Sequence, residues 1–202
     1  MTMKLLGLIC GLGAAVSLAA AGGRPDVTLS DLQAAFQGES NAHARYLAFA
    51  EKADEEGYAG VASLFRAAAR AEEIHAGNHA VVIKRFGATP EAKIEKPVVG
   101  PTVENLKAAI QGETYERDQM YPAFIKHAMN GGSSDAVQTF QFALAAEAEH
   151  ARLYTDALAN LENMTSAVTY YVCPVCGFTT SDPEMEECPT CATPKDHFTQ
   201  VS

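Results

Sequence analysis

Glu72-Glu73-Ile74-His75 and Glu147-Ala148-Glu149-His150 are the stretches that decide the fold of this chain. In each, a Glu and a His stand three residues apart, which places both side chains on one face of a helix, about one turn from each other. Small and apolar residues precede them on that face, so there is room for carboxylates between packed helices. A buried carboxylate needs a positive partner, and no stripe of Lys or Arg follows these faces. The two stretches therefore predict metal ligands inside a helical bundle.

Two further segments complete a ligand set. Gln37-Gly38-Glu39-Ser40 and Gln111-Gly112-Glu113-Thr114 each offer one Glu on an otherwise apolar face. Two Glu-x-x-His helices and two Glu helices form the ligand set of a carboxylate-bridged dinuclear site in a four-helix bundle. Glu116 follows Glu113 by one turn and adds a carboxylate where the other half of the chain has Ala42. Carboxylate oxygens with imidazoles suit iron or manganese.

The chain also repeats itself. Residues 34–40 match residues 108–114 at a separation of 74, and residues 71–76 match residues 146–151 at a separation of 75. The sequence therefore reads as two copies of one helical hairpin. A bundle with a pseudo-twofold axis would bring the repeated Glu and His residues to one centre.

The helix signals predict an all-α fold, with residues 28–163 forming a four-helix bundle. Helices are expected from Thr28 or Ser30 to Glu56, and then over 58–86, 102–130 and 134–163. Residues 87–101 contain three prolines, are too long for a hairpin turn, and predict a long crossover between the second and third helices. Pro122 should kink the third helix, and a kink or one-residue bulge there could turn Tyr121 inward.

The C-terminal residues, 168–202, carry four cysteines in two knuckles. Each knuckle has the form Cys-Pro-x-Cys, at Cys173 and Cys176 and again at Cys188 and Cys191. Two disulfides are possible in an oxidising compartment, but the spacing favours one tetrahedral metal because both sulfurs of each knuckle point into one site. Spacing alone does not separate iron from a structural zinc.

The N-terminal residues, 1–21, have the pattern of a targeting segment. Lys4 is followed by an uncharged run that ends in Ala19-Ala20-Ala21, which predicts a secretory signal peptide, with a retained membrane anchor as the alternative. The protein would then be exported, periplasmic or membrane-anchored, and cytoplasmic if the segment does not function. The formal net charge of −10 argues against nucleic acid and anionic membrane surfaces as partners.

Together these motifs resemble rubrerythrin over residues 29–198. The resemblance rests on Gly38-Glu39-Ser40, Arg45-Tyr46, Met120-Tyr121-Pro122, the six Glu and His motif positions with Glu116, and the four cysteines. It implies a ferritin-like bundle with a rubredoxin-like knuckle domain. It also implies a non-haem di-iron peroxidase that reduces hydrogen peroxide to water in oxidative-stress defence.

The resemblance further implies a role for each residue. Glu72 and Glu147 would bridge two irons, Glu39 would bind the first, and Glu113 with His150 the second. Glu116 and His75 would exchange as ligands of the first iron between its oxidised and reduced states. Tyr46 and Tyr121 would donate hydrogen bonds, although spacing alone allows Tyr46 to be core packing. Cys173, Cys176, Cys188 and Cys191 would hold a third iron.

That third iron would take electrons from a redox donor protein and pass them on across a head-to-tail homodimer. If the chain is exported, an intracellular nicotinamide-linked reductase could not be the direct donor. Two other functions remain open. One is an iron oxidase, and the other is a non-catalytic helical bundle with a structural zinc ribbon. His43, His79 and His127 are expected at the surface or behind the metal ligands.

Overall fold

The computed structural model describes residues 26–202. The predicted signal peptide or anchor, residues 1–21, lies outside the described residues. Within residues 26–202, no helix combines the length and the apolar character needed to cross a membrane.

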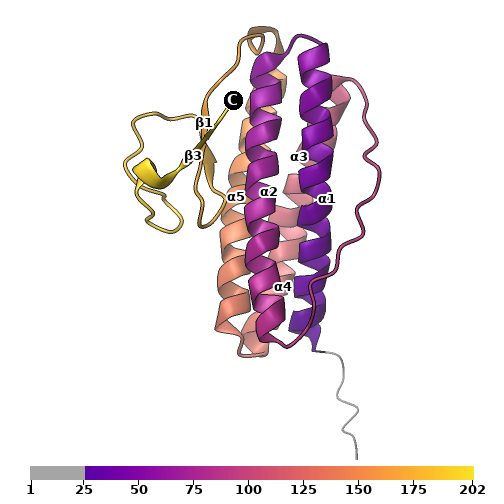
Figure 1. The fold of residues 1–202 in the computed structure, drawn as a ribbon, viewed down its shortest axis with the longest axis vertical. Coiled ribbons are helices and arrows are strands. Elements are labelled where there is room, and N and C mark those ends of the chain that lie inside the picture. The colour runs from indigo at the N-terminus through magenta and orange to yellow at the C-terminus, as the bar shows by residue number, and fades with distance from the viewer. Residues whose placement is uncertain (1–25) are drawn as a thin grey trace, which may run out of the picture.

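Four helical rods form the bundle, as predicted (Figure 1). They are α1 (Val27–Glu55), α2 (Ala59–Arg85), a composite third rod, and α5 (Ser134–Ala159), which is followed by the short 3-10 turn η2 (Leu161–Asn163). The third rod consists of α3 (Thr102–Tyr115), the π turn η1 (Glu116–Met120) and α4 (Tyr121–Asn130). The first and fourth rods run one way and the second and third run the other, which requires one long crossover.

The bounds differ from the sequence prediction at the end of α5, which stops at Ala159 rather than near Asn163, and at the start of α1. The helix begins at Val27 rather than at Thr28 or Ser30, because the Asp26 side chain accepts a hydrogen bond from the Thr28 N–H and caps the helix. At the C-terminal end of α1, Gly57 ends the helix with φ +84°, a conformation that glycine adopts without strain.

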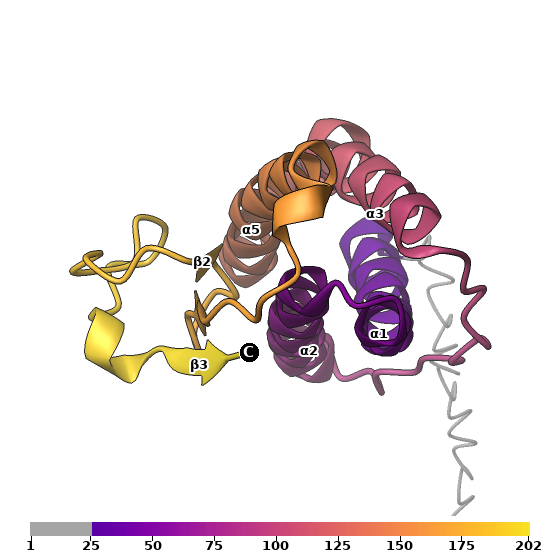
Figure 2. The ribbon, with the colours of Figure 1, turned by 90° about the horizontal axis from the view of Figure 1, so that it is seen from above.

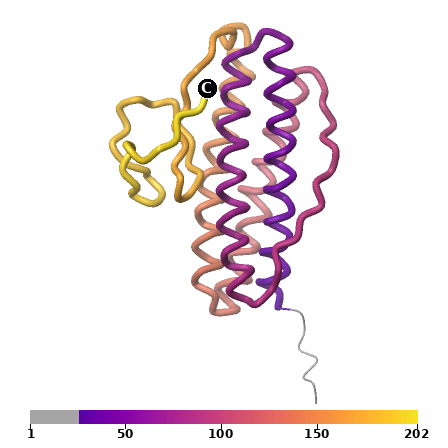
Figure 3. The backbone as a smooth tube through the Cα atoms, in the orientation of Figure 1, coloured from indigo at the N-terminus to yellow at the C-terminus, as the bar shows by residue number. Residues whose placement is uncertain are grey.

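The crossover lies along the outer side of α1 (Figures 2 and 3). Three side-chain amides spaced one turn apart on α1 hold it there. Gln33 donates to the Thr89 carbonyl at 2.7 Å, Gln37 donates to the Lys93 carbonyl at 2.7 Å, and the Asn41 carbonyl oxygen accepts from the Glu95 N–H at 2.8 Å. These bonds satisfy backbone groups in a segment that has no secondary structure of its own.

The π turn η1 turns Tyr121 into the bundle. Glu39 and Tyr46 are seven residues apart on α1, whereas Glu113 and Tyr121 are eight apart, so the third rod carries one additional residue. A π turn accommodates a single inserted residue without ending the helix. Tyr121, at the start of α4, is fully buried as a result.

Two apolar clusters fill the bundle on either side of the Glu and His motifs. On α1, Leu32 and Ala35 belong to one cluster and Ala42 and Tyr46 to the other, with Glu39 between them. The acidic residues therefore lie in the middle of the core.

The C-terminal knuckle domain packs beside α2 and α5 (Figures 1 and 2). Its strands β1 (Tyr170–Val172), β2 (Thr179–Thr180) and β3 (Thr199–Val201) form an antiparallel sheet in the order β2-β1-β3. A 3-10 turn, η3 (Lys195–His197), precedes β3.

Candidate metal centres

Six predicted ligands from four helices meet in the middle of the bundle. They form two groups, in each of which the ligand atoms lie within 4.8 Å of one another. The first group is Glu39, Glu72, His75 and Glu147, and the second is Glu72, Glu113, Glu147 and His150. Glu72 and Glu147 belong to both groups, as expected of carboxylates that bridge two ions. All six side chains are buried.

The carboxylates of this cluster lack sufficient partners of their own. One oxygen of each of Glu39 and Glu113 is buried without a hydrogen bond, and the second oxygens of Glu72 and Glu147 have only a histidine Nδ1 near them, at 3.5 and 2.9 Å. Burial, together with repulsion from neighbouring carboxylates, raises the pKa of Glu39 and of Glu113 well above the ordinary value. Leaving such groups unpaired is costly, and a pair of cations between the four helices would supply what is missing. The residues therefore fit two metal ions.

Each histidine of the cluster is oriented by the knuckle domain. His75 Nε2 lies 3.1 Å from the Cys176 carbonyl oxygen, which only accepts, so Nε2 carries a proton and Nδ1 faces Glu72 and Glu147, 2.9 Å from an oxygen of each. His150 Nε2 lies 3.2 Å from Thr179 Oγ1, whose own proton goes to the Gly177 carbonyl. Such a partner fixes the tautomer in which Nδ1 is available to a metal.

Without metal, protons partly neutralise the cluster. Burial opposes a charge on His150, but hydrogen bonds to Glu147 and Glu72 outweigh it and raise the pKa of His150 to about 9. Burial likewise opposes the charge on Glu147, yet the charge of His75 and the hydrogen bonds from both histidines hold the pKa of Glu147 below its usual range. Metal binding must displace the protons at the two Nδ1 atoms.

The two predicted tyrosines cross between the halves of the bundle. Tyr46 of α1 donates its phenolic proton to Glu113 of α3, and Tyr121 of α4 donates to Glu39 of α1. Both rings are buried, and burial raises the pKa of Tyr46, which keeps its phenol protonated. Tyr46 therefore binds a predicted ligand carboxylate in addition to packing in the core.

Glu116 occupies a different position from the other predicted ligands. It lies in η1, is only partly buried by its neighbours, and belongs to neither ligand group. Burial of its carboxylate, with repulsion from Glu147 and Glu72, raises the pKa of Glu116, while Arg45 acts in the opposite direction. The structure thus places His75, rather than Glu116, in the first group.

The three other histidines singled out in the sequence divide into two kinds. His43 is partly buried and its Nδ1 lies 2.7 Å from the Ala69 carbonyl, while His127 is exposed beside Asp31. His79 is fully buried, and burial together with the charge of His75 lowers its pKa to about 3, so its ring is neutral.

His79 and Thr179 are residues whose contacts the sequence did not reveal. His79 stands four residues after His75 on the same helix face, which was the available signal, whereas Thr179 belongs to no motif.

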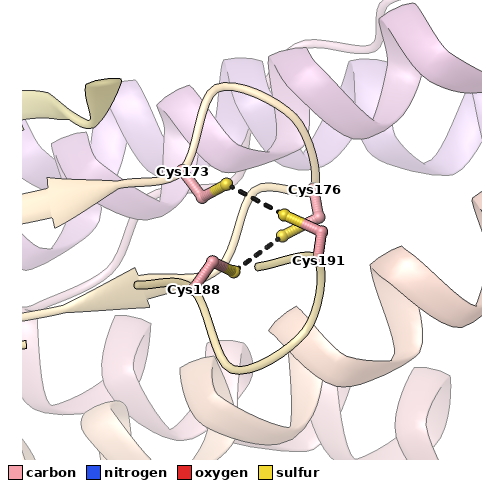
Figure 4. Close-up of side chains that lie close together, drawn as sticks. All are labelled: Cys173, Cys176, Cys188 and Cys191. Carbon is pink, nitrogen blue, oxygen red and sulfur yellow. Dashed lines mark hydrogen bonds between the residues drawn. The ribbon is translucent and has the colours of Figure 1, made fainter. Parts of the chain in front are cut away.

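The four cysteines of the knuckle domain converge on one point (Figure 4). Their sulfurs lie 3.4 Å apart between Cys173 and Cys191 and 3.4 Å apart between Cys176 and Cys188. A disulfide requires about 2 Å, whereas four thiolates around a metal with bonds of about 2.3 Å are separated by a little under 4 Å. The arrangement therefore fits one tetrahedral metal and not two disulfides.

Gly177 allows the knuckle domain to approach His75. It has φ +77°, and a Cβ at this position would lie 2.3 Å from His75 Nε2. Any side chain here would thus collide with a buried ring that also faces the ligand cluster.

Comparison with known proteins agrees with this geometry. The rubrerythrin family model matches residues 31–158. Rubrerythrin-2 of Clostridium acetobutylicum is 41% identical over 176 residues, which cover 85% of this chain and 95% of the relative. Nigerythrin of Nitratidesulfovibrio vulgaris is 41% identical over 177 residues, covering 85% of each chain.

Solved structures show the same likeness. A structure described as the fully reduced, all-ferrous state of nigerythrin superimposes with a TM-score of 0.81 at 35% identity, over 98% of this chain and 100% of that one. The bacterioferritin of Desulfovibrio desulfuricans shares the bundle fold, with a TM-score of 0.63 at 22% identity over 69% of this chain and 82% of that one. With its buried double Glu/His cluster and its four-cysteine knuckle, the chain belongs to the rubrerythrin family of di-iron redox proteins.

Proposed function

We propose that this protein reduces hydrogen peroxide to water, using electrons that enter at the four-cysteine site. The observation that carries the proposal is the hydrogen bond between His75 and the Cys176 carbonyl, which joins the two candidate metal centres directly. When bound, an iron pair supplies two electrons to the O–O bond, and an iron held by four thiolates passes electrons singly with little change in geometry.

The residues of the cluster have distinct tasks in this proposal. Glu72 and Glu147 would bridge the two ions, since each belongs to both ligand groups. Glu39 with His75 would hold one ion, and Glu113 with His150 the other. Glu116 would replace His75 when the oxidation state changes, because it stands beside the cluster and burial disfavours its free charge.

The two tyrosines orient the ligand carboxylates, and the apolar core excludes water from the site. Tyr46 and Tyr121 each hold one ligand carboxylate by a hydrogen bond, which fixes its orientation. The apolar clusters on both sides keep bulk water away from the carboxylates. Exclusion of water strengthens electrostatic interactions within the site.

The route between the centres lies within one chain. His75 Nδ1 faces the carboxylates, and its Nε2–H bonds the backbone of a cysteine ligand, so a single ring spans the gap. Transfer between the centres thus requires no second copy of the chain, although a homodimer or larger homo-oligomer stays a prediction. Cys191 is the one ligand sulfur that is partly exposed, which makes its side of the knuckle the place for a redox donor protein.

An iron oxidase is the competing function. Such an enzyme needs no reduced donor and releases or stores ferric iron. The contact between the knuckle domain and His75 favours the peroxidase, because a relay to the cluster is useful only if the cluster is reduced repeatedly. A non-catalytic bundle with structural zinc would leave this contact, and the unpaired buried carboxylate oxygens of Glu39 and Glu113, without a purpose.

The test is metal content followed by turnover. Protein purified without added metal should contain about three irons per chain, in keeping with the two ligand groups and the cysteine site. With a reduced donor it should consume two electrons per peroxide and take up no net iron. Zinc in the knuckle with no turnover would support the scaffold, and iron uptake coupled to peroxide loss would support the oxidase.

A further inference from the structure

A line of buried polar groups leads from the surface to Glu39. Thr139 Oγ1 lies 3.0 Å from His79 Nδ1, His79 Nε2 lies 3.1 Å from the Tyr121 hydroxyl, and Tyr121 donates to Glu39 Oε1. His79 and Tyr121 have no exposed surface. The line connects α5, α2, α4 and α1, so it crosses the whole bundle.

The directions of these hydrogen bonds follow from one another. Tyr121 gives its proton to the Glu39 carboxylate, so its oxygen must accept from His79 Nε2–H. The neutral ring then has no proton on Nδ1, which must accept from the Thr139 hydroxyl. Every donor therefore points inward, from Thr139 to Glu39.

The outer end of the line reaches a surface pocket. Thr139 is 5% exposed and lines a pocket of about 150 Å³ between α2 and α5. Asn78, Arg85, Asp135 and Gln138 also line this pocket, and the polar side chains among them suit ordered water. Water there can replace the proton that Thr139 gives up.

The other half of the bundle provides a natural comparison. At a separation of 75 residues, Tyr46 corresponds to Tyr121, Phe65 to Phe140, Tyr154 to His79 and Leu64 to Thr139. The rings pack alike: Tyr46 and Tyr154 have centroids 5.6 Å apart, and Tyr121 and His79 have centroids 6.0 Å apart.

The polar line nevertheless exists in only one half. The Tyr154 hydroxyl is buried with no hydrogen-bond partner, and Leu64 offers none. Packing needs would be met equally by both halves, so the polar residues of the His79 half require another explanation.

We propose that Thr139, His79 and Tyr121 form a proton path that serves the Glu39 side of the dinuclear site. The inference rests on the proposed peroxidase function, in which breaking the O–O bond of hydrogen peroxide takes two electrons from the bound metals and two protons, and yields two waters.

In each passage, the Tyr121 proton moves to Glu39 Oε1, the His79 Nε2 proton moves to Tyr121, and the Thr139 proton moves to His79 Nδ1. Pocket water reprotonates Thr139, and Glu39 gives the proton to the departing oxygen. Rotation of the two hydroxyls restores their inward orientation, and turning of the His79 ring toward the pocket lets water take the proton from Nδ1 and return one to Nε2.

The experiment compares Thr139→Val, which removes the hydroxyl but keeps the shape, with Thr139→Ser, which keeps the hydroxyl. Tyr154→Phe, at the position that corresponds to His79 in the half without the polar line, is the matched control. In the iron-loaded full chain, oxidation of the reduced protein by peroxide should slow about a hundredfold in Thr139→Val, the lower end of the effect of a positioned proton donor. The oxidation of Thr139→Val should also show a larger solvent deuterium isotope effect than that of wild type. Thr139→Ser and Tyr154→Phe should behave as wild type.

A second measurement does not depend on turnover. In zinc-loaded, ¹⁵N-histidine-labelled protein, the His79 ring N–H should exchange with solvent more slowly in Thr139→Val than in wild type or Thr139→Ser. If Thr139→Val fails to load metal, Thr139→Ala removes the same hydroxyl.

Equal exchange rates in wild type and in the hydroxyl-free variant would overturn the path, whatever the peroxide assay gives. Slow exchange in the variant, with a wild type that does not consume peroxide, would overturn the proposed function and uphold the path.

Discussion

Gly177→Ala tests the contact between the two metal centres. The added Cβ would lie 2.3 Å from His75 Nε2 and 2.9 Å from its Cδ2, far inside the normal contact distance of about 3.5 Å. The ring is buried, so the knuckle domain must retreat by about 1 Å. The 3.1 Å hydrogen bond from His75 to the Cys176 carbonyl would then exceed hydrogen-bond range.

The energetic cost has two parts that a control can separate. An alanine at φ +77° costs about 1–2 kcal/mol in backbone strain. Loss of the His75 hydrogen bond adds about 1 kcal/mol. Gly57 has φ +84° and no atom within 4 Å of its would-be Cβ, so Gly57→Ala carries the backbone strain alone.

The assay is the rate at which the cysteine-bound iron reduces the peroxide-oxidised cluster, followed by stopped-flow absorbance in the iron-loaded protein. Gly177→Ala should slow this step more than it slows the oxidation of chemically reduced cluster by peroxide, and Gly57→Ala should alter neither rate. Thermal unfolding should show Gly177→Ala to be the less stable variant. Equal re-reduction rates in Gly177→Ala and wild type would refute the reasoning, because electrons would then not require the His75 contact.

Three other outcomes follow from the site. Metal-free protein should unfold at a lower temperature at pH 9 than at pH 6, as read by circular dichroism after chelation. The His150 pKa, raised from 6.5 to about 9, contributes about 3 kcal/mol that is complete below pH 6.5 and lost as pH rises through 9. The raised pKa values of Glu39, Glu113 and Glu116 act in the same direction, since their folded state also binds more protons than the unfolded chain. Glu147, whose pKa is lowered, is ionised in both states across this window, and His79, whose pKa is lowered to about 3, opposes the trend only weakly near pH 6; a melting temperature that rises toward pH 9 would contradict the account. Glu147→Ala should abolish binding of the iron pair, because both ligand groups lose a member, yet keep the thiolate-to-iron colour of the knuckle; simultaneous loss of both, by metal analysis and visible spectrum, would argue against independent centres. Cys188→Ser should stop donor-driven turnover while circular dichroism shows an intact bundle, so normal turnover in that variant would rule out the relay.

The bundle and its six central ligands were predictable because their signals are local. The Glu-x-x-His spacing fixes a helix face, and the internal repeat at 74 and 75 residues shows that the faces converge. The inward turn of Tyr121 was also within reach, because the spacing of eight residues from Glu113 required a bulge or kink that the structure supplies as η1.

Contacts between distant segments were not predictable in this way. The Cys176 carbonyl meets His75 across 101 positions of sequence, and Thr139 meets His79 across 60. A backbone carbonyl and a threonine hydroxyl have no spacing rule, so only tertiary packing reveals them. The close approach at Gly177 is similar, since a glycine after a cysteine knuckle gives no sign of which ring lies against it.

The single residue that distinguishes the third rod from the first has a wider consequence. The π turn η1 absorbs this residue and begins at Glu116, whose corresponding position in α1 is Ala42, so an additional carboxylate stands beside the cluster on one side only. The first hairpin thus preserves the shorter version of the same helix within the same molecule. Deleting one exposed position of η1, such as Gln119, would restore the seven-residue interval but keep Glu116, so Glu116→Ala is needed as well for a symmetric centre with six protein ligands. Whatever reactivity such a centre lacked would be the chemistry that the inserted residue and the carboxylate of Glu116 had brought to the protein.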